Sequence, residues 1–288
     1  MSNLEVGRLP NRSTVQTSIS EIVFSRYSKL LDWFRNEKSV IIALSGGVDS
    51  SVVAAAAFAS LGKSALAVTT NSSTFTDSEL TDAKTLVKLI GIRHLVVEYD
   101  ELDNPDFINN STQRCYFCRE ELVKVLTKVA TDESISAIVD GTNSDDLNDH
   151  RPGMLALREG GVRSPLVECG IGKADVRTIA RALGLPNADK PSNACLASRF
   201  PYGQIITRDK MNRVAQAEDI VKKIAGTKQV RVRDHGDIAR IEVGRDERDS
   251  FFNESIMDQI HLRLKDLGYS YVTLDLIGYR SGSMDETL

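Results

Sequence analysis

Lys38-Ser39-Val40-Ile41-Ile42-Ala43-Leu44-Ser45-Gly46-Gly47-Val48-Asp49-Ser50-Ser51 is the stretch that decides the fold. Its first half, residues 38–44, is apolar and β-branched, which is typical of a buried strand. The Ala-rich residues 52–59 have the length and composition of a helix, and Leu61-Gly62 forms a helix stop. The paired glycines therefore lie at a strand-to-helix turn, where the backbone can approach a ligand and helix N–H groups face an anion. We interpret this turn as a phosphate-binding loop.

The loop is not a Walker A motif, because the pattern G-x-x-x-x-G-K-[ST] occurs nowhere in the chain. A partial match ends in Gly172-Lys173, but Val167 replaces its first glycine and Ala174 its hydroxyl residue. Ser-Gly-Gly-Val-Asp-Ser instead resembles the pyrophosphate loop (PP-loop) of ATP pyrophosphatases, which split ATP to AMP and pyrophosphate while they adenylate a substrate. The resemblance implies that ATP is bound by Ser45, Gly46, Gly47, Asp49, Ser50 and Ser51. The alternative is an ordinary glycine turn between a strand and a helix.

Composition limits the class of protein. The chain has 288 residues, 41% hydrophobic and 26% charged, as in soluble globular proteins of one large domain or two modest ones. A net charge of −4 gives no argument for binding nucleic acid or membranes, and no apolar stretch approaches the roughly 20 residues that span a bilayer. Four cysteines are too few for a secreted disulfide framework, and the N-terminus has no apolar signal segment. We expect a cytoplasmic protein whose polar residues 1–17 are disordered.

Strands and helices alternate through the first two thirds of the chain. The patterns predict helices over 18–36 and 77–90, and strands over 38–44, 64–70, 94–98 and 135–139. This order predicts an α/β fold with a doubly wound parallel sheet, in which ligands bind outside the carboxyl ends of the strands. After about residue 190 the pattern changes to helices over 209–224 and 253–267 and short strands over 229–233, 238–243 and 271–276. We therefore divide the chain into an ATP-binding domain, 18–190, and a smaller α+β domain, 191–288.

Polar side chains follow two of the predicted strands, at the edge of the sheet where the loop is expected. Residues 140–146 read Asp-Gly-Thr-Asn-Ser-Asp-Asp, and residues 71–73 read Asn-Ser-Ser. Magnesium on a triphosphate prefers carboxylate and water ligands. The candidates for contacts with ATP and Mg²⁺ are Asn71, Asp140, Asn143 and Asp145. Asx turns and helix N-caps use the same residue types, and only the neighbouring glycine loop favours the functional interpretation.

Three of the four cysteines form a candidate sulfur site. Cys115 and Cys118 make a C-x-x-C, Cys195 stands alone, and Cys169 is expected to be a buried small hydrophobe. The C-x-x-C lacks the βαβ context of a thioredoxin-like pair and the second ligand pair that zinc needs, and a disulfide is not expected in the cytoplasm. An iron–sulfur cluster on three cysteines, with one iron free to bind and hand over a further sulfur, is one option among these.

Arginines are frequent in the second half of the chain. Arg231 and Arg233 alternate with valines, so both point to one face of a strand, and Arg199 stands in Ser-Arg-Phe-Pro-Tyr-Gly. Guanidinium groups on one face suit a phosphate or a carboxylate. The alternative is a solvated strand face on which they pair with Glu242 or Asp234.

Together these motifs identify a family. In chain order they are Ser-Gly-Gly-Val-Asp-Ser-Ser, Arg-Cys-Tyr-Phe-Cys-Arg, Asp-Gly-Thr-Asn-Ser-Asp-Asp, Ser-Pro-Leu, Ala-Cys-Leu-Ala-Ser-Arg-Phe-Pro-Tyr-Gly and Val-Arg-Val-Arg-Asp-His-Gly-Asp. This combination resembles the LarE family, PP-loop sulfur transferases that build the nickel-pincer nucleotide cofactor of lactate racemase. The likeness runs from about residue 38 to Gly282, and the motifs after the loop are the ones specific to the family.

The resemblance implies a substrate and a reaction. ATP would adenylate the carboxylates of pyridinium-3,5-biscarboxylic acid mononucleotide, and sulfur would displace AMP to give thiocarboxylates. Some members sacrifice one cysteine as the sulfur donor, whereas others bind a 4Fe-4S cluster with an additional sulfide on three cysteines. The residues that match the second type, as cluster ligands and catalytic groups, are Cys115, Cys118 and Cys195. The residues implied to hold the substrate's phosphate are Arg199, Arg231 and Arg233, in a C-terminal domain that would also assemble a homohexamer.

Other functions share part of this pattern. A sacrificial Cys195 would keep the chemistry, but members of that type lack the C-x-x-C. A PP-loop tRNA thiolation enzyme would share the loop and the cysteines, yet the sequence has no zinc ribbon or added RNA-binding domain and is acidic. An amidating PP-loop enzyme would need no clustered cysteines. A nucleotide sensor that binds ATP without turnover would leave the cysteines and the arginines unexplained.

Overall fold

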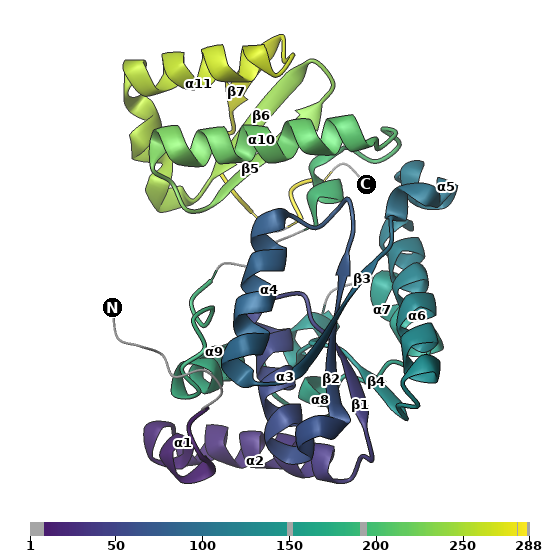
Figure 1. Cartoon of the computed structure of the whole chain (residues 1–288). Coiled ribbons are helices and arrows are strands. Elements are labelled where there is room, and N and C mark those ends of the chain that lie inside the picture. The colour runs from purple at the N-terminus through teal and green to yellow at the C-terminus, as the bar shows by residue number, and fades with distance from the viewer. Residues whose placement is uncertain (1–8, 149–151, 191–194, 281, 287–288) are drawn as a thin grey trace. The chain divides into compact units, whose positions relative to one another are not determined.

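The computed structural model describes residues 9–148, 152–190, 195–280 and 282–286, and the chain divides into two compact units (Figure 1). Unit 1 comprises residues 1–100 and 115–193, and unit 2 comprises residues 101–114 and 194–288. The segment 101–114 thus groups with the C-terminal part of the chain, although it precedes the C-x-x-C. The folding domains 18–190 and 191–288 stay a prediction.

A parallel four-stranded sheet forms the centre of unit 1. The strand order is β3–β2–β1–β4, and the strands are Arg93–Glu98 (β3), Ala65–Asn71 (β2), Val40–Ala43 (β1) and Ala137–Val139 (β4). Val40 pairs with Ala65 on one side and with Ala137 on the other, all in parallel register. Each of the four predicted strands is present, which confirms the α/β fold and brings the carboxyl ends of all four strands to one edge.

Helices cover both faces of this sheet (Figure 1). Successive side chains of a strand point to opposite faces, and because these are buried, each face needs a covering layer. Val40 and Ile42 belong to a core cluster with side chains of α2 (Glu21–Arg35), α3 (Val48–Leu61), α4 (Asp77–Ile90) and α9 (Lys173–Ala182). Ile41, between them, packs in a second cluster with Leu126 of α6 (Arg114–Asp132). The predicted double winding is therefore confirmed. The short helices of unit 1 are α7 (Pro152–Glu159), α8 (Pro165–Glu168), η1 (Gly62–Ser64) and η3 (Ser144–Asn148).

A further helix lies within the stretch 1–17 that we expected to be disordered. α1 (Arg12–Ser18) begins at Asn11, whose side chain accepts a hydrogen bond from the backbone N–H of Thr14. Val15 is fully buried in the core of unit 1. An N-cap and one buried apolar side chain thus give this segment a helical conformation. The structure differs from the expectation over residues 9–17, and residues 1–8 lie outside its described part.

A mixed three-stranded sheet forms the centre of unit 2. β5 (Val230–His235) pairs antiparallel with β6 (Ile238–Val243), which pairs parallel with β7 (Tyr271–Leu274). The helices α10 (Arg208–Ala225) and α11 (Glu254–Asp266) pack on this sheet in one core cluster. The shorter helices are α5 (Pro105–Ile108), η2 (Glu101–Asp103), η4 (Leu196–Arg199) and η5 (Arg245–Phe252). This confirms the smaller α+β unit. Throughout the described part of the chain, no helix combines the length and the apolar character needed to cross a membrane.

Candidate functional site

The glycine loop joins β1 to α3 at the carboxyl end of β1, as predicted. Gly46 has φ +72°, a conformation that side chains rarely adopt, and Gly47 is the N-cap of α3. The Ser50 hydroxyl accepts from the backbone N–H of Ser45 at 3.3 Å and donates to the Gly47 carbonyl at 3.1 Å. Ser51 is fully buried and donates to the same carbonyl at 2.7 Å. These bonds shape the turn, and the first N–H groups of α3 remain available for an anion.

Asn187 supports this loop, although no motif singled it out. Its side-chain amide donates to the Gly46 carbonyl at 3.0 Å and to the Ser51 hydroxyl at 2.9 Å, and the residue is buried. The Gly46 carbonyl is thereby bonded to the protein, so its negative end is not presented to an anion. Asn187 follows Leu-Pro in an ordinary turn sequence, so only the three-dimensional contact reveals its role.

Lys173 also reaches the loop. It is the first residue of α9, and its ammonium forms an ion pair with the Asp49 carboxylate. The side chains of Lys173 and Asp49 are 31% and 19% exposed, so the pair borders solvent. Asp49 also accepts from the side-chain amide of Asn143 at 3.2 Å. In the sequence, Gly172-Lys173 is recognisable only as a partial Walker A match, which does not predict this contact.

Asp140 and Gly141 end β4 beside the loop. Asp140 accepts from the backbone N–H of Thr142 at 3.2 Å and from the Ser164 hydroxyl at 2.8 Å. A Cβ on Gly141 would lie 2.7 Å from the backbone nitrogen of Ser50, so this turn touches the first turn of α3. The contacts of Asp140 are those of the Asx-turn alternative, whereas Gly141 positions the turn against the loop.

Asn143, Asp145 and Asn71 lie at the same edge of the sheet. Asp145 accepts from the backbone N–H of Lys173 at 2.8 Å and so caps α9, and its own N–H donates to the Asn143 side chain at 3.0 Å. Asn71 donates to both carboxylate oxygens of Glu98, at 2.9 and 3.0 Å. Of the predicted residues after β4, Asn143 bonds to a side chain of the glycine loop, that of Asp49.

A magnesium site would have to share its ligands with ATP. Among the described residues, no three Cys, His, Asp or Glu side chains are grouped closely enough to hold a metal ion. Mg²⁺ bound to a nucleotide takes its other ligands from phosphates and water and needs only one or two carboxylates. Asp49 is the carboxylate within the loop itself.

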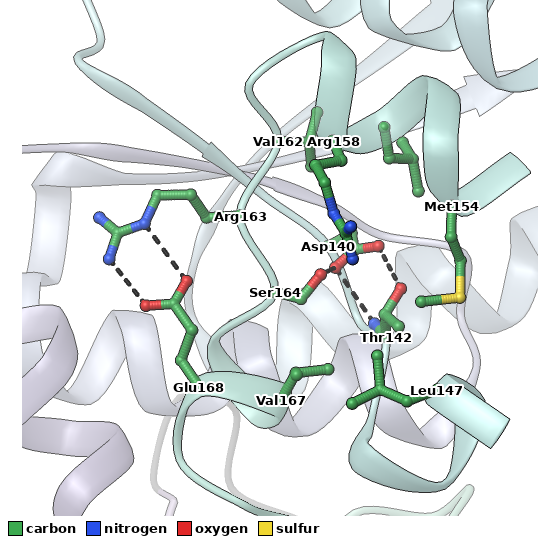
Figure 2. Close-up of a pocket in the computed structure, with 11 residues that line it drawn as sticks. Asp140, Thr142, Leu147, Met154, Arg158, Val162, Arg163, Ser164, Val167 and Glu168 are labelled. Atoms are coloured by element: carbon green, nitrogen blue, oxygen red, sulfur yellow. Dashed lines mark hydrogen bonds and ion pairs between the residues drawn. The ribbon is translucent and has the colours of Figure 1, made fainter.

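A cavity of about 220 Å³ lies behind the turn after β4 (Figure 2). Its wall is partly apolar, with Met154 and Leu147, and Arg158 extends toward Asp140 in Figure 2. Pockets for drug-sized ligands measure about 300 to 1,000 Å³. The cavity is therefore too small for a mononucleotide, and we do not include it in the ATP site.

Cys115 and Cys118 open α6 and share one face of it, three residues apart. Cys115 is exposed, Cys118 is half-buried, and the Tyr99 hydroxyl lies 3.9 Å from the Cys118 sulfur. A Cβ on Gly153 would lie 3.1 Å from the Cys115 carbonyl oxygen, so α7 starts close against α6. Burial opposes the charge of Arg119, but attraction to Cys118, then to Asp140 and Cys115, raises the pKa of Arg119 above its usual value. A cation therefore lies beside the two thiols.

The other two cysteines differ in accessibility. Cys195 is exposed at the N-cap of η4, in unit 2. Cys169 is half-buried against the core of unit 1, and burial raises its pKa to about 11. A thiol with that pKa stays protonated at neutral pH, which fits the packing role expected of Cys169. The structure groups two of the three predicted cluster ligands, Cys115 and Cys118, on one helix, and the third, Cys195, is exposed in unit 2.

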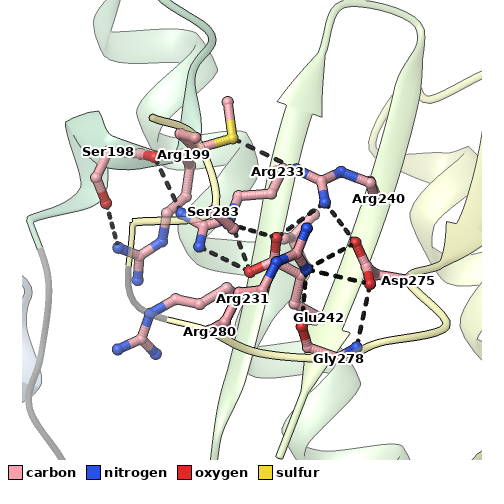
Figure 3. A network of polar contacts seen from close by, with 12 residues as sticks. Ser198, Arg199, Arg231, Arg233, Arg240, Glu242, Asp275, Gly278, Arg280 and Ser283 are labelled. Carbon is pink, nitrogen blue, oxygen red and sulfur yellow. Dashed lines mark hydrogen bonds and ion pairs between the residues drawn. The ribbon is translucent and has the colours of Figure 1, made fainter. Parts of the chain in front are cut away.

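The three predicted arginines lie together in unit 2 (Figure 3), and each is at most 4% exposed. Arg199 donates from Nε and Nη2 to the two oxygens of Glu218, at 2.7 and 3.1 Å. Arg233 donates from Nε and Nη2 to one oxygen of Glu242, at 3.0 and 2.7 Å. These are buried ion pairs, so the arginines do not form the solvated strand face that was the alternative, although the pairing with Glu242 is real.

Arg231 gives this cluster an excess of positive charge. Burial and the neighbouring charge of Arg199 both lower the pKa of Arg231, and its guanidinium carbon lies 5.2 Å from the Tyr279 ring centroid. Of the two carboxylates beside the arginines, Glu218 pairs with Arg199, and Glu242 pairs with Arg233 and, at 3.0 Å, with Arg240. An added anion would relieve the repulsion among the arginines.

The arginine cluster is bonded directly to the segment that carries Cys195. Arg199 donates from Nη1 to the Cys195 carbonyl at 3.0 Å, and Arg233 donates from Nη1 to the Ser198 carbonyl at 3.0 Å. The structure therefore brings a predicted sulfur residue and the predicted phosphate-binding arginines into one part of unit 2.

Comparison with known proteins identifies the family of the chain. The NAD synthase family model matches residues 31–123, which contain the loop. The chain is 42% identical over 264 residues to the uncharacterized protein slr1717 of Synechocystis sp., covering 92% of this chain and 98% of that protein. It is 37% identical over 267 residues to the pyridinium-3,5-bisthiocarboxylic acid mononucleotide synthase of Lactiplantibacillus plantarum, covering 92% and 95% of the two chains.

A third similar protein is the uncharacterized protein MJ0830 of Methanocaldococcus jannaschii, which is 30% identical over 255 residues, 88% of this chain and 95% of that one. These matches extend over nearly the whole chain, 88% to 92% of it. With its loop, its parallel sheet and these identities, the chain belongs to the LarE family of PP-loop sulfurtransferases and is an ATP-using enzyme.

Proposed function

We propose that this enzyme converts the carboxylates of pyridinium-3,5-biscarboxylic acid mononucleotide to thiocarboxylates, as a step in making the nickel-pincer nucleotide of lactate racemase. The observation that carries the proposal is the contact between the arginine cluster and the Cys195 segment. A substrate whose phosphate binds the arginines would lie next to the residue implied in sulfur delivery. The similarity to the synthase of Lactiplantibacillus plantarum supports the same substrate.

ATP activates the substrate in the first step. A carboxylate oxygen of the substrate attacks the α-phosphorus of ATP. The bond from the α-phosphorus to the oxygen that bridges to the β-phosphorus breaks, and pyrophosphate leaves with the electron pair. In the proposed site the N–H groups at the start of α3 and the ammonium of Lys173 would stabilise this charge, and Mg²⁺ held through Asp49 and the phosphates would share it. The acyl adenylate has a good leaving group, which the free carboxylate lacks.

Sulfur enters in the second step. A sulfur nucleophile attacks the acyl carbon, and the bond from that carbon to the AMP oxygen breaks, so AMP leaves as an anion and the thiocarboxylate remains. Cys115, Cys118 and Cys195 would hold a 4Fe-4S cluster, which supplies the sulfide when it is bound. Cys169 does not suit this role, because its raised pKa of about 11 opposes the thiolate form that ligates iron.

Iron analysis tests this proposal most directly. Chain purified without oxygen is expected to contain about four irons. Cys118→Ser is expected to lose the iron and the thiolation, whereas the control Cys169→Ser is expected to keep both. An iron-free protein that still forms thiocarboxylate would contradict the cluster. A loss of one H₂S from Cys195 after turnover would establish the sacrificial route instead.

The acceptor is tested separately. Release of pyrophosphate from ATP should increase with the pyridinium mononucleotide and not with tRNA. The opposite response would replace the proposed substrate by RNA.

We also propose a cytoplasmic homohexamer that assembles through unit 2, and light scattering of the intact chain tests its size. Large apolar side chains exposed on unit 2 support this assembly, namely Phe252, Tyr271, Leu276 and Ile277.

A further inference from the structure

Two further arginines of unit 2 are more accessible to solvent than the three predicted ones (Figure 3). The side chains of Arg240, on β6, and Arg280 are 24% and 27% exposed, whereas the predicted arginines are at most 4% exposed. Both guanidinium groups pair with Asp275, Arg240 at 2.5 Å and Arg280 at 3.4 Å. An anion that arrives from solvent would meet Arg240 and Arg280 first, and we call these two residues the outer arginines.

The carboxylates beside the outer arginines do not balance their charge. Asp275 is shared by both of them. Glu242 lies 3.0 Å from Arg240, but it is also the partner of Arg233. Two guanidinium groups thus have one carboxylate to themselves, so the outer arginines can bind a further anion.

Glu286 supplies such an anion from the chain itself. Its two carboxylate oxygens accept from Nε and Nη2 of Arg280, the latter at 2.7 Å. This paired geometry is the one that arginine uses for carboxylates and phosphates. The hydrogen bond from Arg280 lowers the pKa of Glu286, and the charges of Arg280 and Arg240 lower it further. Glu286 is therefore held beside the outer arginines in its charged form.

The segment 282–286 holds Glu286 at one end and is fixed at the other. Ser283 is 5% exposed, and its hydroxyl donates to Glu242 at 2.7 Å. The side chain of Glu286, in contrast, is 52% exposed. An ion pair at such a position contributes little to stability. A stronger anion can therefore displace the Glu286 carboxylate without removing Ser283 from its buried position.

We propose that the outer arginines form a binding site for a phosphomonoester, and that Glu286 occupies this site until the phosphate displaces it. A phosphate dianion carries more charge than a carboxylate and offers three acceptor oxygens to the two guanidinium groups. The inference rests on the proposed function for its ligand, because the pyridinium mononucleotide is the phosphomonoester that we expect there. The outer site would be the first to receive the substrate's phosphate.

Glu286→Gln removes the charge of this occupant and keeps its size. Calorimetry measures binding of the pyridinium mononucleotide to the full chain, with a non-hydrolysable ATP analogue present to fill the glycine loop. The variant is expected to bind about two- to fivefold more tightly than the parent, as for removal of an exposed ion pair. The control Asp258→Asn removes the same charge from an exposed position on α11 and should leave the affinity unchanged. Equal or weaker binding in Glu286→Gln would overturn the proposal.

A double variant tests whether Glu286 acts through Arg280. Arg280→Met alone is expected to weaken the mononucleotide about tenfold or more, because it removes charged hydrogen-bond donors. In the Arg280→Met background, Glu286→Gln should have no effect, since the competing contact is already absent. If the gain from Glu286→Gln persisted there, Glu286 would act only through its general charge, and the outer site would be rejected.

Inorganic phosphate separates the outer site from its proposed ligand. It is titrated into the parent and into Glu286→Gln under the same conditions as the mononucleotide. Tighter binding of phosphate to the variant, with no binding of the mononucleotide to either protein, would keep the outer site and remove the proposed substrate. Equal binding of the mononucleotide to both proteins would remove the outer site and keep the proposed substrate.

Discussion

Lys173 is the single side chain to which we assign charge stabilisation in the proposed first step. Its ammonium is held beside the loop by Asp49, so it is in place before ATP binds. Lys173→Met should slow pyrophosphate release at saturating ATP about 10²-fold, the usual cost of removing one group that stabilises developing charge. The melting temperature should change little, because the ion pair borders solvent.

Lys190→Met is the matched control for that prediction. Lys190 pairs with Asp82 at 2.6 Å, and its side chain is 29% exposed, close to the 31% of Lys173. Steady-state pyrophosphate assays should show a change of less than about threefold, as for an exposed ion pair. Equal losses in both variants would mean that Lys173 only maintains the fold.

A substitution of Asn187 tests whether the glycine loop depends on its hydrogen bonds to the Gly46 carbonyl and the Ser51 hydroxyl. Asn187→Leu removes the donors to Gly46 and Ser51 and leaves buried acceptors without a partner, which costs about 1–3 kcal/mol. If half of that cost falls on the ATP-bound state, calorimetry should show ATP binding weakened by about two- to twelvefold. Asn11→Ala is the control, because it removes an N-cap of unit 1 worth about 1 kcal/mol without contact to the loop. Unchanged ATP affinity in Asn187→Leu would exclude a positioning role.

At the scale of elements, local sequence predicted those whose signals are strong. The strands of the parallel sheet and α2, α4, α10 and α11 lie close to the predicted ranges, and Thr207 caps α10 as proposed for it. α6 was missed because its first turn is the C-x-x-C and its apolar stripe is narrow. That stripe, Leu122, Leu126 and Val129, does have helical spacing and packs against the sheet.

The contact between the end of β4 and the start of α3 gives an element-level prediction. Gly141→Ala would place a Cβ 2.7 Å from Ser50 N and 2.9 Å from Ser50 Cα, so one element must shift. We expect a loss of about 1–3 kcal/mol in unfolding free energy and loss of measurable ATP binding. Gly161→Ala, with φ +73° and open space around it, should cost about 1 kcal/mol and leave ATP binding intact. Retained binding in Gly141→Ala would show that the loop tolerates this displacement.

Glu218 of α10 joins three elements and makes unit 2 sensitive to acid. It accepts from Arg199 of η4 and from the backbone N–H of Val232 on β5, at 3.1 Å. Burial would raise the pKa of Glu218, but attraction to Arg199 lowers it below its ordinary value. A lowered pKa contributes stability above the unfolded-state value of about 4.3, and this contribution is lost as pH falls through the folded-state pKa.

Glu218→Gln tests that sign. At pH 7 urea unfolding should show a loss of about 3 kcal/mol, because Arg199 is left buried without its charge partner. The difference between the parent and Glu218→Gln should shrink as the pH falls below about 4. A difference that stays constant with pH would contradict the proposed cause. Arg263→Ala, on the exposed face of α11, should not change the acid dependence.

On the scale of the whole molecule, sequence motifs identified the candidate site residues but not the residues that hold them in place. The loop, the cysteines and the arginines were all recognised as local patterns. The partners that hold them were not, because Glu218 and Asn187 are far in sequence from the groups they bond. Hydrophobic period and motif spacing describe neighbours along the chain, whereas these contacts depend on how distant segments meet.

The ATP loop and the arginine cluster belong to different units, and this separation gives the last prediction. Unit 1 holds the loop for ATP, and unit 2 holds the arginines proposed for the substrate's phosphate. Arg233→Lys keeps the charge but cannot reproduce the paired donors to Glu242, so the charge would no longer be held in the same place. The variant should bind the pyridinium mononucleotide about 10²-fold more weakly. ATP binding measured by calorimetry should stay unchanged, and only the substrate-dependent pyrophosphate release should fall. A matching loss of ATP affinity would mean that Arg233 stabilises the enzyme as a whole, and the arginine cluster would then not be the substrate site.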